Sequence, residues 1–242
     1  MSTRIYHPEY MEVGQIYCLG ADASHHLQHV LRFKVGGVFD VFDGQENEYQ
    51  AQVHAIEKKQ IQFIVKQRFD VCRESALKIH LAQGIAKGDR WTYSLQKAVE
   101  LGVHSFTPLW TQHVAYKWEK KIDDKKISQW RSIVVSACEQ SGRTRLPNLH
   151  PIQTLDDFLR QEQFGNKIIL QTELGRHWRQ IEWHPGQSVS VLIGPEGGFS
   201  HEEYEKALAA GYQGMTLGPR ILRTETAVVS ALTILQSVYG DL

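Results

Sequence analysis

The chain has few cysteines and no long apolar segment. Its three cysteines, Cys18, Cys72 and Cys138, are odd in number and far apart in a sequence of 242 residues. That pattern argues against a disulfide framework and favours a reducing, cytoplasmic environment. No apolar run approaches the roughly 18 residues that a membrane span needs, and the first residues contain no apolar region typical of a signal peptide. We therefore expect a cytoplasmic protein of one large or two small domains.

Several motifs of common enzyme classes are also missing. There is no Gly-x-Gly-x-x-Gly fingerprint and no phosphate-binding loop, which argues against dinucleotide and nucleoside triphosphate sites. There is no Gly-x-Ser-x-Gly elbow of a serine hydrolase, and Cys138 lies in an apolar run typical of a core. His25, His26 and His29 have a helical spacing that could hold zinc, but no further ligand set accompanies them, so we expect no metal.

The net charge is zero, but the charge is unevenly distributed. Residues 71–145 contain 13 basic and 7 acidic side chains, so this part of the chain could face phosphates. The alternative is a solvated helix face with no partner. The lysines of this stretch are Lys117, Lys120, Lys121, Lys125 and Lys126.

Residues 1–70 are predicted to form a small β-barrel. Short alternating or β-branched segments separated by turns indicate strands, and apolar spacing indicates one short helix. The predicted strands are 38–42, 48–56 and 60–65, and the predicted helix is 24–31. Closely spaced short strands are typical of a barrel. Residues 70–75 are predicted to be a linker.

Residues 76–242 are predicted to form an α/β domain with a mostly parallel sheet, because strands and helices alternate. The strands are expected at 77–82, 106–109, 167–171 and 189–193. The helices are expected at 89–101 and 125–140, from 201 to Gly211, and from 224 or 226 to about 239. Asp89 is the expected N-cap of the first helix and Ser200 begins a capping box for the third. Thr224 or Thr226 is expected to cap the last.

Two loops near the C-terminus are the most informative segments. Each follows an apolar strand and runs into a helix, at residues 194–200 and 217–223. Loops of this kind meet at the carboxyl edge of a parallel sheet, where open α/β folds bind ligands. They also contain Glu196, Arg220 and Arg223, with Glu225 just beyond. The alternative is two ordinary strand–helix turns.

A third segment, residues 139–145, contains Glu139, Arg143 and Arg145 at the predicted end of a helix. Arginine side chains match phosphate geometry, and a glutamine or glutamate can contact base edges. The same residues could instead form a basic C-terminal helix cap.

Five motifs in order along nearly the whole chain give it a resemblance to the RsmE family of 16S rRNA uridine-N3 methyltransferases. These motifs are HLQHVLR at 26–32, KAVELGV at 97–103, ACEQSGR at 137–143, LIGPEGGFS at 192–200 and LGPRILRTETA at 217–227. The resemblance implies a PUA-like RNA-binding barrel followed by a SPOUT-type α/β domain with a deep trefoil knot. It also implies S-adenosylmethionine as cofactor, a homodimer, and a uridine in the decoding region of the small ribosomal subunit as substrate. Because the protein is neutral overall, we expect the assembled subunit to be preferred over free RNA.

The resemblance and the chemistry of uridine together suggest roles for individual residues. Uracil N3 carries a proton and reacts only once that proton leaves, so the site needs a base or groups that stabilise the anion. The predicted catalytic residues are Arg220 and Arg223 for the anion, with Glu225 or Glu139 as proton acceptor. The predicted cofactor-binding residues are Leu170, Thr172, Gly194, Glu196, Gly197, Leu217, Leu222 and Thr226. The predicted RNA phosphate contacts are Arg4, Arg32, Arg143 and Arg145.

Three other interpretations remain open at this point. The chain could be a non-catalytic RNA-binding protein, a metabolic enzyme with a nucleotide cofactor, or a methyltransferase of transfer RNA. The arginines and the glutamate after residue 219 argue against the first, and the missing phosphate-binding fingerprint argues against the second.

Overall fold

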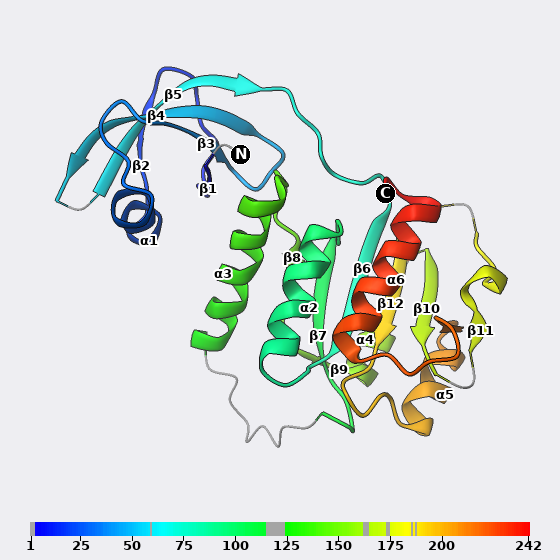
Figure 1. Cartoon of the computed structure of the whole chain (residues 1–242). Coiled ribbons are helices and arrows are strands. Elements are labelled where there is room, and N and C mark those ends of the chain that lie inside the picture. The colour runs from blue at the N-terminus through cyan, green and yellow to red at the C-terminus, as the bar shows by residue number, and fades with distance from the viewer. Residues whose placement is uncertain are drawn as a thin grey trace. The chain divides into compact units, whose positions relative to one another are not determined.

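The computed structural model describes residues 3–58, 60–114, 124–161, 165–172, 175–184, 186 and 188–242 (Figure 1). The chain divides into two compact units, which are described separately. The first contains Met1–Glu74 and Cys138–Leu146, and the second contains Ser75–Ala137 and Pro147–Leu242. The units are therefore not two consecutive stretches of sequence, because residues 138–146 belong with the N-terminal part.

The first unit is built on one five-stranded sheet. Its strands are β1 (Arg4–Tyr6), β2 (Ile16–Cys18), β3 (Val38–Phe42), β4 (Glu48–Glu57) and β5 (Gln60–Phe69). They are ordered β1-β3-β4-β5-β2, with β1 and β3 parallel and the other pairs antiparallel. The three longer strands were predicted, and the fold is the small barrel-like sheet that the sequence indicated.

The core of this unit follows from the alternation of side chains along its strands. On β4, Tyr49, Ala51 and Val53 are buried while the residues between them are partly exposed, as expected for a strand with one face on a core. Phe39 and Phe63 pack against each other in that core. The predicted helix at 24–31 is instead a short α1 (Ala21–His25) followed by a π-helical turn, η1 (His26–Val30).

The second unit contains an eight-stranded sheet in which every described strand pair is parallel. Its strands are β6 (Lys78–Gly84), β7 (Ser105–Trp110), β8 (Asn148–Leu149), β9 (Gln153–Thr154), β10 (Asn166–Leu170), β11 (Arg176–His177), β12 (Ser188–Ile193) and β13 (Gln213–Thr216). Their order is β11-β13-β10-β12-β6-β7-β8, and β9 pairs with β7. The mostly parallel α/β domain predicted from the sequence is confirmed.

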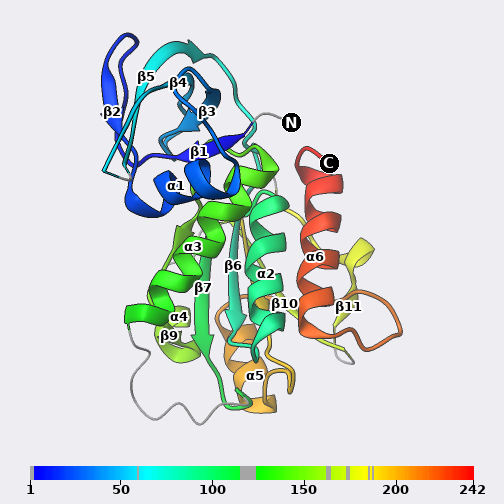
Figure 2. The same cartoon turned by 60° about the vertical axis from the view of Figure 1, so that its left-hand side comes forward.

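Helices cover both faces of this sheet. The helices are α2 (Asp89–Glu100), α3 (Asp124–Ser141), α4 (Leu155–Arg160), α5 (His201–Ala209) and α6 (Thr224–Tyr239), with a short 3-10 turn η2 (Trp178–Gln180). The last residues of α3, from Cys138 on, belong to the first unit. Figure 2 shows α2 and α6 side by side on one face. Neighbouring side chains of β6 point to opposite faces. Ala82 joins a core cluster with α4 and α5, whereas Gln83 donates to Ser94 of α2 and Thr224 of α6, each at 3.2 Å.

Of the three predicted helix N-caps, one is confirmed. Ser200 forms the capping box: its hydroxyl accepts from the Glu203 amide, and the Glu203 carboxylate accepts from the Ser200 amide. The caps predicted for the other two helices are wrong. Gly88, not Asp89, precedes α2, and Arg223 precedes α6. The Thr224 hydroxyl binds a carbonyl of a neighbouring loop instead of its own helix.

A partly buried histidine should make this unit sensitive to acid. His80 of β6 lies near His104 and His150, and its Nδ1 is 2.8 Å from the Ser105 hydroxyl. Burial, and then the charges of His104, His150 and Lys78, lower the pKa of His80 from 6.5 to about 4. The folded state therefore binds fewer protons than the unfolded state between these pH values. The free energy of unfolding consequently decreases as the pH falls from 6.5 to 4.

Replacing His80 with asparagine removes that titration. We expect the urea midpoint of the parent to fall more steeply between pH 6.5 and 4 than that of His80→Asn. His54, which is exposed on β4, provides the control, and His54→Asn should follow the parent. Parallel midpoint curves for His80→Asn and the parent would contradict the prediction.

Candidate active site

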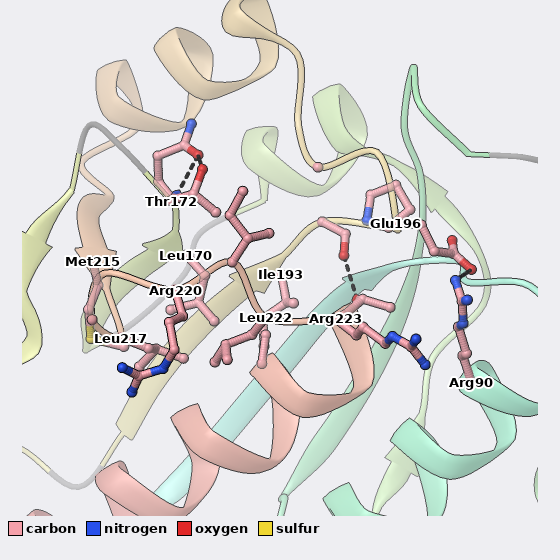
Figure 3. A pocket seen from close by; sticks show the side chains of 18 residues that line it. Arg90, Leu170, Thr172, Ile193, Glu196, Met215, Leu217, Arg220, Leu222 and Arg223 are labelled. Carbon is pink, nitrogen blue, oxygen red and sulfur yellow. Dashed lines mark hydrogen bonds and ion pairs between the residues drawn. The ribbon is translucent and has the colours of Figure 1, made fainter.

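A pocket opens where the neighbouring parallel strands β13, β10 and β12 end (Figure 3). Its volume is about 350 Å³, which suits a small molecule. Leu170 and Ile193 line it from the ends of β10 and β12, and Leu217 and Leu222 line it from the segment between β13 and α6. The carboxyl edge of a parallel sheet is the usual place for a ligand in an open α/β fold.

Hydrogen bonds hold together the segments that surround the pocket. The pocket loop after β12, residues 194–200, turns back on itself, because the Gly198 amide donates to the Pro195 carbonyl at 2.9 Å. The Thr224 hydroxyl donates to the Gly194 carbonyl at 2.7 Å. After β10, the Gln171 amide donates to the Met215 carbonyl of β13 at 2.9 Å. The start of α6 and the ends of three strands are thus fixed around one cavity.

Close backbone approach explains why glycine stands at two positions. A Cβ at Gly194 would lie 2.8 Å from the Cα and carbonyl carbon of Gly198 and 3.0 Å from the Phe199 nitrogen. A Cβ at Gly84, where β6 ends, would overlap Pro195. The pocket loop therefore packs directly against itself and against the next strand, and its backbone faces the cavity.

The Thr224 hydroxyl should contribute measurably to stability. It is buried, donates to the Gly194 carbonyl and accepts from the Gln83 side chain. Thr224→Val keeps the shape of the side chain but removes both of these hydrogen bonds. We therefore expect the free energy of unfolding to fall by about 1–3 kcal/mol. Chemical denaturation measures this loss. Thr224→Ser, which keeps the hydroxyl, should recover most of it, and equal losses in the two variants would contradict the role of the hydrogen bonds.

The structure gathers most of the predicted cofactor and anion-stabilising residues at this pocket. Those that line it are Leu170, Thr172, Gly194, Glu196, Leu217, Leu222, Arg220 and Arg223. Arg220 and Arg223 are exposed, and their side chains have no hydrogen-bond or ion-pair partner among the described residues. Gly197 and Thr226 do not line the cavity. The Gly197 carbonyl lies 3.0 Å from Nδ1 of His113, and Thr226 is exposed beside Ala227, which does line it.

The two predicted proton acceptors lie in different units. Glu225 is in the first turn of α6, next to the pocket, but one carboxylate oxygen is buried without a hydrogen bond among the described residues. Glu139 belongs to the first unit, where it accepts a hydrogen bond from the Tyr6 amide at 3.0 Å. Burial raises the pKa of Glu139, and the Tyr6 amide and the charges of His26 and Arg4 oppose that rise.

Two of the four predicted RNA contacts are used inside the first unit. Arg4 pairs with Glu48 at 2.7 Å and donates to the carbonyls of Cys138 and Arg143. Arg143 is only 4 % exposed and pairs with Glu74 at 2.5 Å. The guanidinium groups of Arg4 and Arg143 are thus paired within the unit, and their contacts with RNA phosphate stay predictions.

The other predicted basic contacts are at the surface. Arg32 is exposed, and so is Arg145, which pairs with Glu46 at 2.9 Å. Lys125 and Lys126 are exposed at the start of α3. Lys117, Lys120 and Lys121 lie outside the described residues.

The sequence interpretation missed Arg90, which lines the pocket from α2. Its Nη1 lies 3.2 Å from the Glu196 carboxylate. The available signal was its position just after β6, which is the strand next to β12 in the sheet. That adjacency joins segments about 110 residues apart and is not visible in the local pattern.

Other chemistries find little support in the part of the chain that is described. The rings of His25 and His29 are 4.8 Å apart, but no group of three or more His, Cys, Asp or Glu side chains within the described ranges could hold a metal. Burial raises the pKa of the Cys138 thiol to about 12, which makes it a poor nucleophile. Of the helices described, none is long and apolar enough to cross a membrane.

Comparison with known proteins agrees with this fold. Residues 73–236 match the family model described as an RNA methyltransferase domain, and residues 19–66 match the RNA methyltransferase PUA domain. Ribosomal RNA small subunit methyltransferase E of Buchnera aphidicola subsp. Schizaphis graminum is 34 % identical, covering 99 % of this chain and 97 % of the relative. The same enzyme of Bacillus subtilis is 28 % identical, covering 92 % and 90 %.

Two solved structures are similar over the whole of both chains. A protein from Legionella pneumophila in complex with the cofactor SAM has a TM-score of 0.95 and 41 % identity. Ribosomal RNA small subunit methyltransferase E from Neisseria gonorrhoeae, bound to S-adenosyl methionine, has a TM-score of 0.92 and 34 % identity. The fold and the matching family models thus define an RNA methyltransferase domain joined to a PUA domain. More narrowly, the chain belongs to the ribosomal RNA small subunit methyltransferase E family.

Proposed function

We propose that the protein binds S-adenosylmethionine in the pocket and methylates N3 of one uridine in the decoding region of 16S rRNA. The observation that carries this proposal is the pocket itself, formed by the loops after β10, β12 and β13 in a chain of this family. The similar Legionella and Neisseria proteins were solved with this cofactor bound.

The residues present fit such a cofactor. Leu170, Ile193, Leu217 and Leu222 offer apolar surface for a base and a ribose face, and the backbone of Gly194 and Glu196 offers polar groups. Gly194 has no side chain, so its backbone can line the cavity directly. S-adenosylmethionine supplies an activated methyl group on a sulfonium when bound.

The protein side chains then have to prepare the uridine. Arg220 and Arg223 are exposed at the pocket and have no partner in the described structure, so both can donate to O2 and O4 as N3 loses its proton. Preorganised donors of this kind stabilise a developing anion without reorganisation. Glu139 and Glu225 stay the two candidates for the proton acceptor. The target base has to leave its stack to reach such a pocket.

The first unit is proposed to bind the RNA, as the PUA assignment of residues 19–66 suggests. Arg32 and Arg145 are exposed and provide phosphate contacts in this proposal. We also propose that the second unit carries the trefoil knot of SPOUT methyltransferases and that the protein is a homodimer.

The test is methyl transfer to small ribosomal subunits that lack the modification. Purified protein is incubated with labelled S-adenosylmethionine and either these subunits, free 16S rRNA or bulk transfer RNA, and the labelled nucleoside is mapped. The proposal expects 3-methyluridine at one position, with assembled subunits as the better substrate. Label found only in transfer RNA would mean that transfer RNA, and not 16S rRNA, is the substrate. Absence of transfer to any RNA, despite measurable cofactor binding, would refute the catalytic assignment.

A further inference from the structure

Three charged side chains from three separate elements meet at one side of the pocket. Arg90 comes from α2, Glu196 from the pocket loop and Glu225 from the first turn of α6. Figure 3 shows Arg90 and Glu196 paired on the opposite side of the view from Arg220. The arrangement joins three parts of the chain that are separated in sequence by about 30 to 135 residues.

The Glu196 carboxylate is directed at α2. Its Oε1 accepts from the backbone amide of Lys87 at 3.0 Å and from Nη1 of Arg90 at 3.2 Å. Lys87 lies just before Gly88, the residue that precedes α2 and provides no side-chain cap. The amino end of a helix attracts a carboxylate because its amides are unpaired and its dipole is positive there. Glu196 therefore docks the pocket loop onto the start of α2 and uses its charge to do so.

Arg90 is placed between two carboxylates. Its Nε is 4.0 Å from Oε1 of Glu225, and the other oxygen of Glu225 is buried without a hydrogen bond in the described structure. Arg90 thus balances Glu196 on one side and Glu225 on the other. Without it, the pocket loop would keep only the Lys87 amide as partner for Glu196, with a second carboxylate nearby.

We infer that Arg90 is a positioning residue for the cofactor: through Glu196 it fixes the pocket loop whose backbone lines the cavity. This inference rests on the proposed binding of S-adenosylmethionine. It gives Glu196 a different role from the contact with the cofactor that the sequence suggested. It also separates Arg90, which acts through the loop, from Arg220 and Arg223, which face the substrate in our proposal.

The test is a double-mutant cycle on cofactor affinity, measured by calorimetry without RNA. Arg90→Gln and Glu196→Gln keep the side-chain size and remove the charges. We expect each to raise the Kd for S-adenosylmethionine about 5- to 20-fold, as for a partly exposed, charge-assisted pair. The Kd of the double variant should be no more than about twice that of the weaker-binding single variant, because both changes break the same contact. Arg90→Lys should recover most of the affinity.

Two further measurements distinguish positioning from other roles. At saturating cofactor and RNA, kcat of Arg90→Gln should stay within about threefold of the parent, and its melting temperature should be nearly unchanged. Arg160→Ala removes an exposed pair with Asp157 on α4 and serves as the matched control with unchanged Kd. Three results would each overturn the inference: additive losses of binding free energy in the double variant, an unchanged Kd in Arg90→Gln, or a large fall in its kcat at saturation. Failure of the parent itself to bind the cofactor would overturn the proposed function as well.

Discussion

Replacing Arg223 with alanine is expected to lower the methyl-transfer rate by about 10²- to 10³-fold while leaving cofactor affinity within about threefold, as for removal of one donor to a developing oxyanion. The side chain is exposed at the pocket. It precedes α6 without making a side-chain cap, so its removal costs the helix no hydrogen bond. The loss should therefore fall on the chemical step.

Single-turnover kinetics with saturating enzyme measure that step, and calorimetry measures the cofactor Kd. Arg223→Lys should keep part of the rate, since it retains a charge but not the planar fork of donors. Arg160→Ala is again the control, because Arg160 is an exposed arginine of α4 that does not line the pocket. A cofactor Kd that rises as much as the rate falls would assign Arg223 to cofactor binding and refute its role toward the uridine.

The regular part of the fold could be predicted from the sequence because its signals are local. Long apolar or alternating runs gave β3, β4, β6, β7, β10 and β12 to within a few residues. Strands of two or three residues, such as β1, β8 and β11, contain too few positions for a periodicity to appear. The π-helical turn at His26–Val30 was missed because its apolar spacing over one turn resembles that of an α-helix.

The pocket was predicted where the evidence is local and missed where it depends on topology. Glu196 and Arg223 follow apolar strands within loops whose glycines are visible in the sequence. Arg90 joins them only because β6 lies next to β12 in the sheet. The internal pairing of Arg4 and Arg143 was missed for a related reason. A sequence does not show that Glu48 and Glu74, far away along the chain, hold these guanidinium groups.

Gly194→Ala is expected to weaken cofactor binding by at least 100-fold. The new Cβ would lie 2.8 Å from two backbone atoms of Gly198 and 3.0 Å from the Phe199 nitrogen. Those neighbours are backbone atoms, so no side-chain rotation relieves the overlap and the pocket loop must shift. The Gly194 carbonyl is also tied to Thr224, so the shift spreads to the start of α6. Both walls of the cavity would then move.

Calorimetry with S-adenosylmethionine measures the effect without RNA. Gly20→Ala is the matched control, since a Cβ there meets nothing within 4 Å and Gly20 lies in the first unit. Gly194→Ala should show a lower melting temperature than the parent but a folded circular dichroism spectrum, because the strained atoms are confined to one loop. A Kd within threefold of the parent would mean that the loop accommodates the methyl group, and that the cofactor does not depend on its backbone position.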